Sequence, residues 1–422
     1  MEKEYENESK TIGSAEYFRE MELRETKSKA YIGGVLCGLC ISCAALIIFS
    51  IFGDIKFTSK ADSSKDSIIT KDVESKVELI QNSIAKYYLN DYDNEMLENG
   101  IYKGILESLG DPYSTYYSRE EMQKVAESTE GVYYGIGAYV ALDKETEGGR
   151  ITKVMNGSPA EEAGVLDGDV IVKVDGENVL GLSLSDIVSK IKGPENTQVL
   201  LSLYREGESD YIELSVTRRQ IESPTVVYEM LDGHIAYIQI TEFDSVTTDQ
   251  FKTALEQAKA DQMESLILDL RDNPGGNLTD VVAIAGEILP KGLVVYTEDK
   301  NGKRQEYRSD GKNELDVPMV VLVNGYSASA SEILAGSIKD YNKGTILGTT
   351  TYGKGIVQRI YSVSDGSAIK LTVSHYYTPN GNDIHGVGIE PDETLEFDTE
   401  AYQQDGTDNQ LERAKEILGG RE

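Results

Sequence analysis

Cysteine is scarce in this chain of 422 residues, and its three copies, Cys37, Cys40 and Cys43, share one short apolar stretch near the N-terminus. The rest of the chain has no cysteine with which to form a disulfide, bind a metal or act as a nucleophile. The spacing of three places the cysteines along one side of a helix, which would favour helix association. Small residues buried in a membrane give the same pattern.

Histidine is equally rare, with copies only at His234, His375 and His385. A Ser-His-Asp triad would need one of them beside its nucleophile. His234 precedes a strand-like run and is typical of a turn, while the other two flank the loop YYTPNGNDI. None of them stands in a recognisable triad context. The sequence therefore favours a reaction without a catalytic histidine, and the triad remains the alternative.

Clusters of positive charge are missing as well. The chain has 41 lysines and arginines against 73 acidic residues, a formal net charge of -32, and the charges are spread along it. Phosphate binding requires clustered lysine and arginine, so we expect no nucleic acid partner. The excess of acidic residues favours solubility and repels anionic surfaces.

One long apolar run stands near the N-terminus, YIGGVLCGLCISCAALIIFSIF, which begins at Tyr31 and carries no charge. It is long enough to cross a hydrocarbon core of about 30 Å. We predict a polar segment over 1–30, a transmembrane anchor over 31–53 and a flexible linker over 54–71. A cleaved signal peptide fits less well because a long polar region precedes the run. Lysines and arginines flank both sides, so charge alone does not orient the anchor.

Ser329 stands in the segment NGYSASASEILAGSIKD. The apolar run PMVVLVN before it is typical of a strand, and Ile333, Leu334 and Ile338 after it follow helical spacing. Ser329 therefore lies at a predicted strand-to-helix turn. The first N–H groups of a helix have no partner within it, so they can hold a developing oxyanion. The competing interpretation is that the alternating serines only cap the helix.

Lys354 follows 25 residues later, in TILGTTTYGKGIVQ. This segment predicts a strand that ends in a tight loop, with Lys354 between Gly353 and Gly355. Gln358 lies four positions further on and, on an extended segment, shares a face with Lys354, where its amide can orient the amine. A lysine acts as a base only if burial removes its proton near neutral pH. The competing interpretation is a solvated loop tip.

A third segment, DLRDNPGG, joins the apolar run SLILDLRDN to the helix-period run LTDVVAIAGEIL. The turn Asn273, Pro274, Gly275 and Gly276 is therefore a predicted strand-to-helix connection. Its glycines allow the backbone to approach a substrate carbonyl without a side chain in the way. An ordinary connection would show the same pattern, so this turn supports catalysis only together with the serine and lysine segments.

These three segments strongly resemble those of the C-terminal processing peptidases, also called tail-specific proteases, which are serine endopeptidases with a Ser/Lys dyad. The resemblance runs from GILESLGDPYSTYYSREE to YYTPNGNDIHGVGIEPD, over nearly the whole chain after the linker. It implies that Ser329 is the nucleophile, that Lys354 is the general base and that Gln358 positions Lys354.

The same resemblance implies how the oxyanion is held. Backbone N–H groups of Ala330 and of one glycine of the Pro-Gly-Gly turn would donate to it, and the choice between Gly275 and Gly276 stays open. The reaction requires no metal and no organic cofactor. The resemblance also places the catalytic part outside the cytoplasm.

A second module is predicted over 121–219, with EGVYYGIGAYVAL followed by NGSPAEEAGVLDGDVIVKVDGENV and the helix-period segment SLSDIVSKIKG. This order resembles a PDZ domain, which binds C-terminal peptides by strand addition and receives their carboxylate on backbone N–H groups. The resemblance assigns the carboxylate loop to Tyr134, Gly135, Ile136 and Gly137. Most apolar residues of this module would simply form its core.

Helix-period segments over 72–120 resemble the part that in relatives packs on the protease core or mediates dimerisation, so a homodimer is an expected partner. Strands and helices alternate over 220–398, which argues for an α/β layer. We predict an α/β protease core similar to the crotonase and ClpP folds, an inserted β-rich PDZ domain and an N-terminal transmembrane helix. Residues 399–422 would add a C-terminal tail and helix.

The sequence thus predicts a serine endopeptidase anchored in the cell membrane by a single pass. It would cleave protein or peptide substrates with exposed C-terminal tails. One alternative is a membrane-tethered PDZ adaptor with an inactive protease core, but such a protein would lack a dyad residue and none is missing here. Another alternative is a crotonase-like acyl-transfer enzyme, against which the PDZ insertion and the serine and lysine segments argue.

Overall fold

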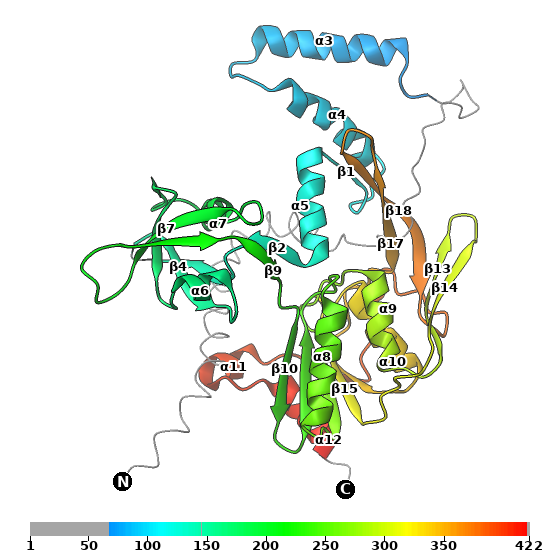
Figure 1. The fold of residues 1–422 in the computed structure, drawn as a ribbon. Helices are drawn as coiled ribbons and strands as arrows, with labels where there is room; N and C mark the ends of the chain where they lie inside the picture. Colours follow the sequence, from blue (N-terminus) through cyan, green and yellow to red (C-terminus); the bar gives the residue numbers. More distant parts are fainter. Residues whose placement is uncertain (1–66, 145, 420–422) are drawn as a thin grey trace.

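The computed structural model describes residues 67–144 and 146–419, which form an N-terminal arm, a β-rich domain and an α/β core (Figure 1). The predicted polar segment over 1–30, the predicted anchor over 31–53 and most of the predicted linker lie outside the described residues. Within the described part of the chain, no helix is both long enough and apolar enough to span a membrane.

The arm projects from the body at the top of Figure 1. Its first two helices begin at side-chain caps, because Thr70 accepts a hydrogen bond from the Val73 N–H and Asp93 accepts one from the Glu95 N–H. Neither helix has a buried residue. The arm comprises α3 (Lys71–Tyr87), α4 (Asn94–Glu107), β1 (Thr115–Tyr117) and α5 (Arg119–Glu130).

Helix α5 leads from the arm into the β-rich domain. It begins at a capping box, in which Ser118 and Glu121 each accept a hydrogen bond from the other's backbone N–H. It ends at Gly131, whose φ of 66° is the left-handed backbone that glycine adopts without strain. A two-stranded ribbon, β2 (Val132–Gly135) with β9 (Arg219–Glu222), then forms both the entrance to the domain and the exit from it.

The β-rich domain lies at the left of Figure 1 and is a sheet in the order β3-β4-β5-β7-β8, with β6 paired to β5. Ile151, Ile171, Ile187 and Leu201 are fully buried at its centre. β3 is an edge strand of this sheet. The elements are β3 (Ala138–Leu142), β4 (Gly149–Val154), α6 (Pro159–Ala163), β5 (Val170–Val174), β6 (Glu177–Asn178), α7 (Leu184–Ile191), β7 (Gln198–Tyr204) and β8 (Ile212–Thr217).

The α/β core has a six-stranded sheet in the order β10-β11-β12-β15-β16-β19. Strands β11 to β19 pair in parallel, and only β10 is antiparallel to its neighbour. The strands are rich in β-branched and aliphatic residues, as expected where both faces are covered. They are β10 (Val226–Leu231), β11 (Ile235–Ile240), β12 (Ser265–Asp269), β15 (Met319–Val323), β16 (Thr345–Gly348) and β19 (Glu393–Thr394).

Helices cover both faces of this sheet. Leu268 and Val321 on one face pack in the same core cluster as Phe251 of α8 and Leu334 of α10. On the other face, residues of the strands pack with Ala414 of α12, so the C-terminal helix is part of the core. The helices are α8 (Thr247–Ala260), α9 (Leu278–Gly286), α10 (Ala330–Asp340), α11 (Thr399–Asp405) and α12 (Asn409–Gly419).

A second sheet connects the arm to the core, because β1 of the arm pairs antiparallel with β18. Its order is β1-β18-β13-β14, and β17 also pairs with β18. Figure 1 shows β17 and β18 rising from the core toward α4. The remaining strands are β13 (Gly292–Asp299), β14 (Arg304–Ser309), β17 (Ile356–Ser362) and β18 (Ala368–Tyr377).

Candidate active site

Three connections meet at one edge of the six-stranded sheet. They are residues 270–277 after β12, residues 324–329 after β15 and residues 349–355 after β16. These three strands are adjacent and parallel, so their carboxyl ends reach the same edge, where ligands bind in open α/β sheets. The predicted serine, lysine and glycine segments are therefore brought together by the topology.

Ser329 immediately precedes α10 and is only 3% exposed. Its φ of 54° and ψ of -111° are a backbone conformation that a residue with a side chain rarely adopts. Such strain is retained where the surrounding structure enforces it. Here the Tyr376 hydroxyl donates to the Ser329 carbonyl at 2.9 Å, and the Ser329 N–H donates to the Glu332 carboxylate at 2.8 Å.

Glu332 connects the serine segment to the lysine segment. Its buried carboxylate accepts hydrogen bonds from the Lys354 N–H at 2.9 Å, the Gly353 N–H at 2.7 Å and the Thr351 hydroxyl at 2.6 Å, in addition to that from Ser329. Burial raises the pKa of Glu332, although these four hydrogen bonds oppose the shift. Sequence reasoning missed this residue. The spacing S-x-x-E from Ser329 to Glu332, which is typical of a capping box, is the signal that could have found it.

Lys354 lies in the loop before β17 and is 1% exposed, so it is not a solvated loop tip. Burial, together with repulsion from Lys370, lowers the pKa of Lys354 to about 7, although Glu332 and Asp111 oppose the shift. The Tyr376 hydroxyl also contacts the Lys354 carbonyl. Tyr376 and Glu332 thus fix the backbones of both predicted dyad residues.

The Pro-Gly-Gly turn packs directly against the serine. A side chain on Gly275 would place its Cβ 2.7 Å from the Ser329 Cβ, and the Gly275 φ is 103°. The Gly275 N–H donates to the Asn273 side chain at 2.8 Å. Among the described residues, no hydrogen-bond acceptor is found for the N–H of Gly276 or of Ala330. These two N–H groups are the available donors beside Ser329.

A pocket of about 10 Å³ opens in front of these groups. Its lining is mostly apolar, which suits an apolar side chain of a bound peptide. It is lined by Gly276, Leu278, Ser329, Ala330, Ile333, Val357 and Tyr376.

Gln358 lies on β17 and is 1% exposed. Its Nε2 donates to the Thr372 hydroxyl at 3.3 Å, while its amide oxygen is buried without a hydrogen-bond partner in the described part of the chain. Strand alternation does not place the side chains of Gln358 and Lys354 on one face, because Lys354 precedes the strand and a bulge lies between Val357 and Gln358. Its role in positioning Lys354 remains a prediction.

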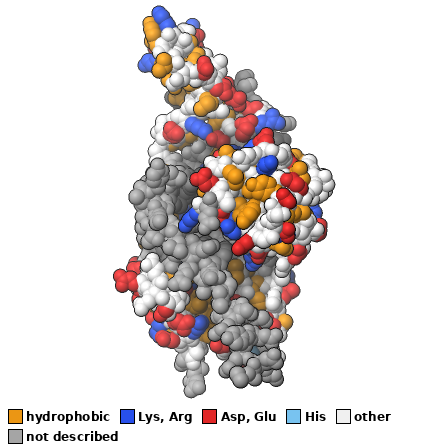
Figure 2. Space-filling model, turned by 90° about the vertical axis from the view of Figure 1, so that its left-hand side faces the viewer, with side chains coloured by type: hydrophobic (Ala, Val, Ile, Leu, Met, Phe, Trp, Pro, Cys, Tyr) orange, Lys and Arg blue, Asp and Glu red, His pale blue; other side chains and the backbone are white. Residues whose placement is uncertain are grey.

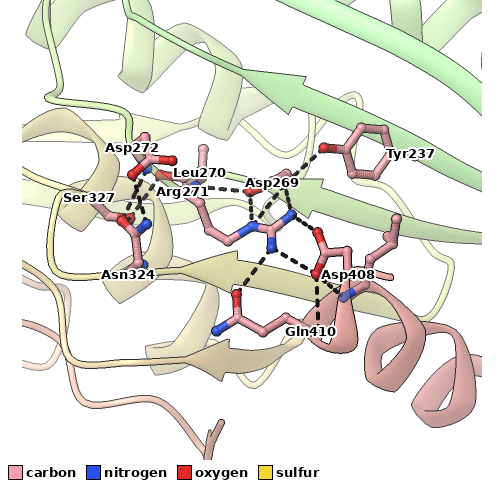
Figure 3. Close-up of polar contacts among 10 residues, drawn as sticks. Tyr237, Asp269, Leu270, Arg271, Asp272, Asn324, Ser327, Asp408 and Gln410 are labelled. Carbon is pink, nitrogen blue, oxygen red and sulfur yellow. Dashed lines mark hydrogen bonds and ion pairs between the residues drawn. The ribbon is translucent and has the colours of Figure 1, made fainter. Parts of the chain in front are cut away.

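A network of ion pairs and hydrogen bonds holds the edge of the sheet in place (Figure 3). Arg271 pairs with Asp269 at 2.6 Å and with Asp408 at 2.8 Å, so the segment before the Pro-Gly-Gly turn is fixed to the C-terminal helical region. Asp272 and Asn324 exchange hydrogen bonds at 3.0 and 2.9 Å, which connects the glycine turn to the serine turn. Sequence reasoning missed these residues because their partners are distant in the chain.

The three histidines are exposed. His234 lies in a turn with a φ of 55°. His375 lies 3.7 Å from Asp383, and its ring contacts that of His385 at 5.5 Å between centroids. Among the described residues, no hydrogen bond joins any of them to Ser329, so the geometry offers no support for a triad.

In the predicted carboxylate loop, Tyr134 and Gly135 are the last residues of β2, and Ile136 and Gly137 lie between β2 and the edge strand β3. The carbonyls of Ile136 and Gly137 accept hydrogen bonds from Ala160 and Met155, whereas no acceptor is found for their own N–H groups among the described residues. Gly137 has a φ of 76°, and a Cβ there would overlap Ser158. This backbone conformation therefore requires glycine and leaves N–H groups available at the end of the edge strand.

Three protein families match consecutive parts of the chain. The description "activating protease CtpB N-terminal domain" matches residues 52–121, "PDZ domain" matches 150–205 and "peptidase family S41" matches 234–395. These matches follow the order of arm, β-rich domain and α/β core.

Curated relatives agree with this assignment. A probable CtpA-like serine protease of Staphylococcus saprophyticus is 34% identical over 363 residues, which are 85% of this chain and 72% of that protein. One of Staphylococcus aureus is 36% identical over 332 residues, 78% of this chain and 66% of that protein's length. The photosystem II D1 C-terminal processing protease, a solved structure, is 31% identical with a TM-score of 0.46, covering 81% of this chain and 90% of that one.

The chain belongs to peptidase family S41 and carries a PDZ domain. The predicted family is thereby confirmed, and its curated relatives are named as probable serine proteases.

Proposed function

We propose that this protein is a serine endopeptidase in which Ser329 is the nucleophile and Lys354 the general base. The environment of the Lys354 amine carries the proposal. The lysine amine is buried, its pKa is lowered to about 7, and Glu332 ties its loop to the backbone of Ser329. A lysine with this pKa is partly neutral at neutral pH and can accept the serine proton.

The arrangement of these groups supports an acyl-enzyme reaction. Neutral Lys354 takes the Ser329 proton, and the serine oxygen attacks the substrate carbonyl carbon. The N–H groups of Ala330 and Gly276 hold the oxyanion, because that of Gly275 already donates to Asn273. The lysine ammonium gives its proton to the leaving amine, and water then hydrolyses the acyl-enzyme. The unpaired amide oxygen of Gln358 supports a role in accepting a hydrogen bond from the Lys354 ammonium.

The size of the pocket beside Ser329 favours a small apolar residue on the acyl side of the cleaved bond. The pocket holds little more than one methyl or water-sized group. Leu278, Ile333 and Val357 offer no charged partner, so an acidic or basic side chain would be buried there without compensation.

The test of the dyad uses purified full-length protein, an unfolded protein substrate and a fluorophosphonate probe. The wild type should cleave the substrate and become labelled at Ser329. Ser329→Ala should do neither while it keeps its thermal unfolding midpoint. Ser337→Ala is the matched control, because that serine is buried in the same helix but its hydroxyl only bonds the Leu334 carbonyl. Labelling of Ser329→Ala at the wild-type rate would refute the proposal.

The PDZ domain is proposed to recognise the C-terminal tail of the substrate. The available N–H groups of Ile136 and Gly137, beside Tyr134 and Gly135, support this role, since β3 beside them is an edge strand to which a peptide can add. A peptide with a free terminal carboxylate should be cleaved with a lower KM than the same peptide as its amide. Equal KM values for the two peptides would contradict tail recognition.

Two further parts of the proposal concern location and assembly. The apolar run over 31–53 supports a single-pass anchor in the cell membrane. The resemblance to the tail-specific proteases, and not the run itself, is the reason to propose that the catalytic part lies outside the cytoplasm. The arm exposes large apolar side chains, among them Leu79, Ile80 and Met96, and Figure 2 shows apolar groups on its surface at the top of the molecule. These favour a homodimer through the arm. A monomeric mass at micromolar concentration would contradict the dimer.

A further inference from the structure

The turn between α4 and β1 of the arm lies beside Lys354. We call Asp111–Ser114 the DPYS turn after its sequence. The Lys354 Nζ is 4.8 Å from the centre of the Tyr113 ring, so one wall around the amine comes from the arm. The strand β1 that follows the turn pairs with β18 and places Thr115 opposite Lys370 (Figure 1).

Hydrogen bonds fix the DPYS turn to the core. Asp111 accepts from the Tyr113 N–H at 2.9 Å and from the Ser114 hydroxyl at 2.6 Å. The Ser114 oxygen accepts from the Thr372 N–H at 3.1 Å, and the Thr372 hydroxyl accepts from the Gln358 amide at 3.3 Å. These hydrogen bonds connect the arm to Gln358, the residue predicted to position Lys354. A movement of the arm would therefore change the surroundings of Lys354.

A second buried lysine faces the same space. Lys370 on β18 is 2% exposed, and its Nζ is 5.2 Å from the Tyr117 ring of the arm. Burial lowers the pKa of Lys370 to about 8, and Asp111 opposes this shift. The titratable groups around Lys354 therefore come from four segments of the chain. They are Asp111 and Tyr113 of the DPYS turn, Glu332 of α10, Lys370 and Tyr376 of β18, and Tyr352, which hydrogen-bonds with Tyr113.

We propose that Tyr113 is a positioning residue whose ring closes the amine of Lys354 off from water, and that Asp111 and Lys370 set the charge around it. The inference rests on the proposed role of Lys354 as the base. A ring face attracts a cation, but a ring in a closed site also removes the water that would stabilise the ammonium. The removal of water prevails here because Lys354 and Lys370 are both buried. Repulsion between the two ammonium groups also favours a neutral amine at Lys354.

The proposal gives the arm a function in the reaction itself. Glu332 and Tyr376 hold the dyad backbones from within the core, whereas the ring over the amine is delivered from outside it. A core without the arm in place would keep both dyad residues but expose Lys354 to solvent. Placement of the arm therefore sets the fraction of molecules in which the lysine is a competent base.

The test titrates Lys354 directly in the full chain. The rate of its trace acetylation by acetic anhydride is followed against pH by mass spectrometry, beside the pH profile of peptide hydrolysis. Tyr113→Phe, which keeps the ring, should titrate as the wild type does. In Tyr113→Ala the pKa of Lys354 should rise by about one unit or more, so hydrolysis at pH 7 falls by about fivefold or more and recovers at higher pH. A merely structural role would lower the rate by the same factor at every pH.

Two further variants, which should shift the pKa of Lys354 in opposite directions, keep the test decisive if Tyr113→Ala does not fold. Lys370→Met removes a like charge and should raise the pKa of Lys354, whereas Asp111→Asn removes an opposite charge and should lower it. An unshifted Lys354 titration in folded Tyr113→Ala, or shifts of the same sign in both charge variants, would overturn the proposal. The acetylation rate of Lys354 does not depend on enzyme activity, so it tests the role of Tyr113 even if Lys354 is not the base. Failure of the Ser329/Lys354 proposal would appear in a different measurement, as hydrolysis by Lys354→Ala.

Discussion

Replacement of Lys354 with alanine should reduce peptide hydrolysis by about 10⁴-fold, while the protein still folds. The reason is that Ser329 then has no base, and the only remaining contributions are those of the oxyanion donors and substrate binding. The loss should appear in kcat rather than KM, because the lysine acts on the proton of the serine and not on the bound peptide. Initial rates at several pH values, together with the thermal unfolding midpoint, are the measurements.

Two matched variants distinguish the role of Lys354 as a base from the effects of its positive charge and of its side-chain volume. Lys354→Arg keeps a positive charge but should be equally inactive, because a guanidinium does not lose its proton in proteins. Lys354→Met keeps the volume without the amine. Hydrolysis by the arginine variant at more than a small fraction of the wild-type rate would contradict general-base catalysis by Lys354.

The methionine variant also tests the burial of the amine through stability. The pKa of Lys354 is lowered from 10.5 to about 7 in the folded protein, so between these values the unfolded chain binds more protons. Wild-type stability should therefore rise with pH across this window relative to Lys354→Met. The methionine variant should be the more stable at pH 7 and below. Equal pH dependence of the two unfolding free energies would show that the amine is solvated when folded.

Substitution of Gly276 with alanine is expected to lower kcat by about 10²- to 10³-fold, which corresponds to about 3–4 kcal/mol of transition-state stabilisation. The Gly276 φ is 144°, and an added Cβ would overlap the carbonyl oxygen of Phe243. The turn must then shift, and the Gly276 N–H no longer points at the oxyanion. Steady-state kinetics on one peptide, compared with the wild type, measure the effect.

Gly286 supplies the matched control for this substitution. It lies at the end of α9, the helix that follows the same turn, and a Cβ added there meets nothing within 4 Å. Gly286→Ala should leave kcat unchanged. If Gly276→Ala folds and keeps the wild-type kcat, the Gly276 N–H is not a donor to the oxyanion.

The sequence was sufficient to predict the local structure of the serine segment and of the Pro-Gly-Gly turn because each obeys a local rule. An apolar run followed by a polar turn and a helical period marks the connection that holds Ser329, and the same pattern marks the Pro-Gly-Gly turn. The structure shows that adjacent parallel strands bring the carboxyl ends of these segments to one edge, whereas from the sequence only the family resemblance implied that they meet. The family resemblance added the roles of Ser329 and Lys354.

The partners of these segments could not be predicted in this way. Glu332 is a first-turn acid in the sequence, and only the fold shows that its carboxylate reaches the backbone of Lys354. Tyr113 lies more than 200 residues before Lys354, so no periodicity relates them. The bulge before Gln358 breaks the alternation from which its side-chain direction was argued. The choice between Gly275 and Gly276 needed the hydrogen bond from Gly275 to Asn273.

The most direct measurement of the central claim is the pH dependence of Ser329 phosphonylation by the fluorophosphonate probe, in the wild type and in Lys354→Ala. The account predicts that the wild-type rate constant rises with a midpoint near pH 7, the pKa to which burial lowers Lys354, and that the alanine variant loses this rise. A wild-type midpoint near 10.5, the ordinary value for lysine, or equal rates in the two proteins would contradict it.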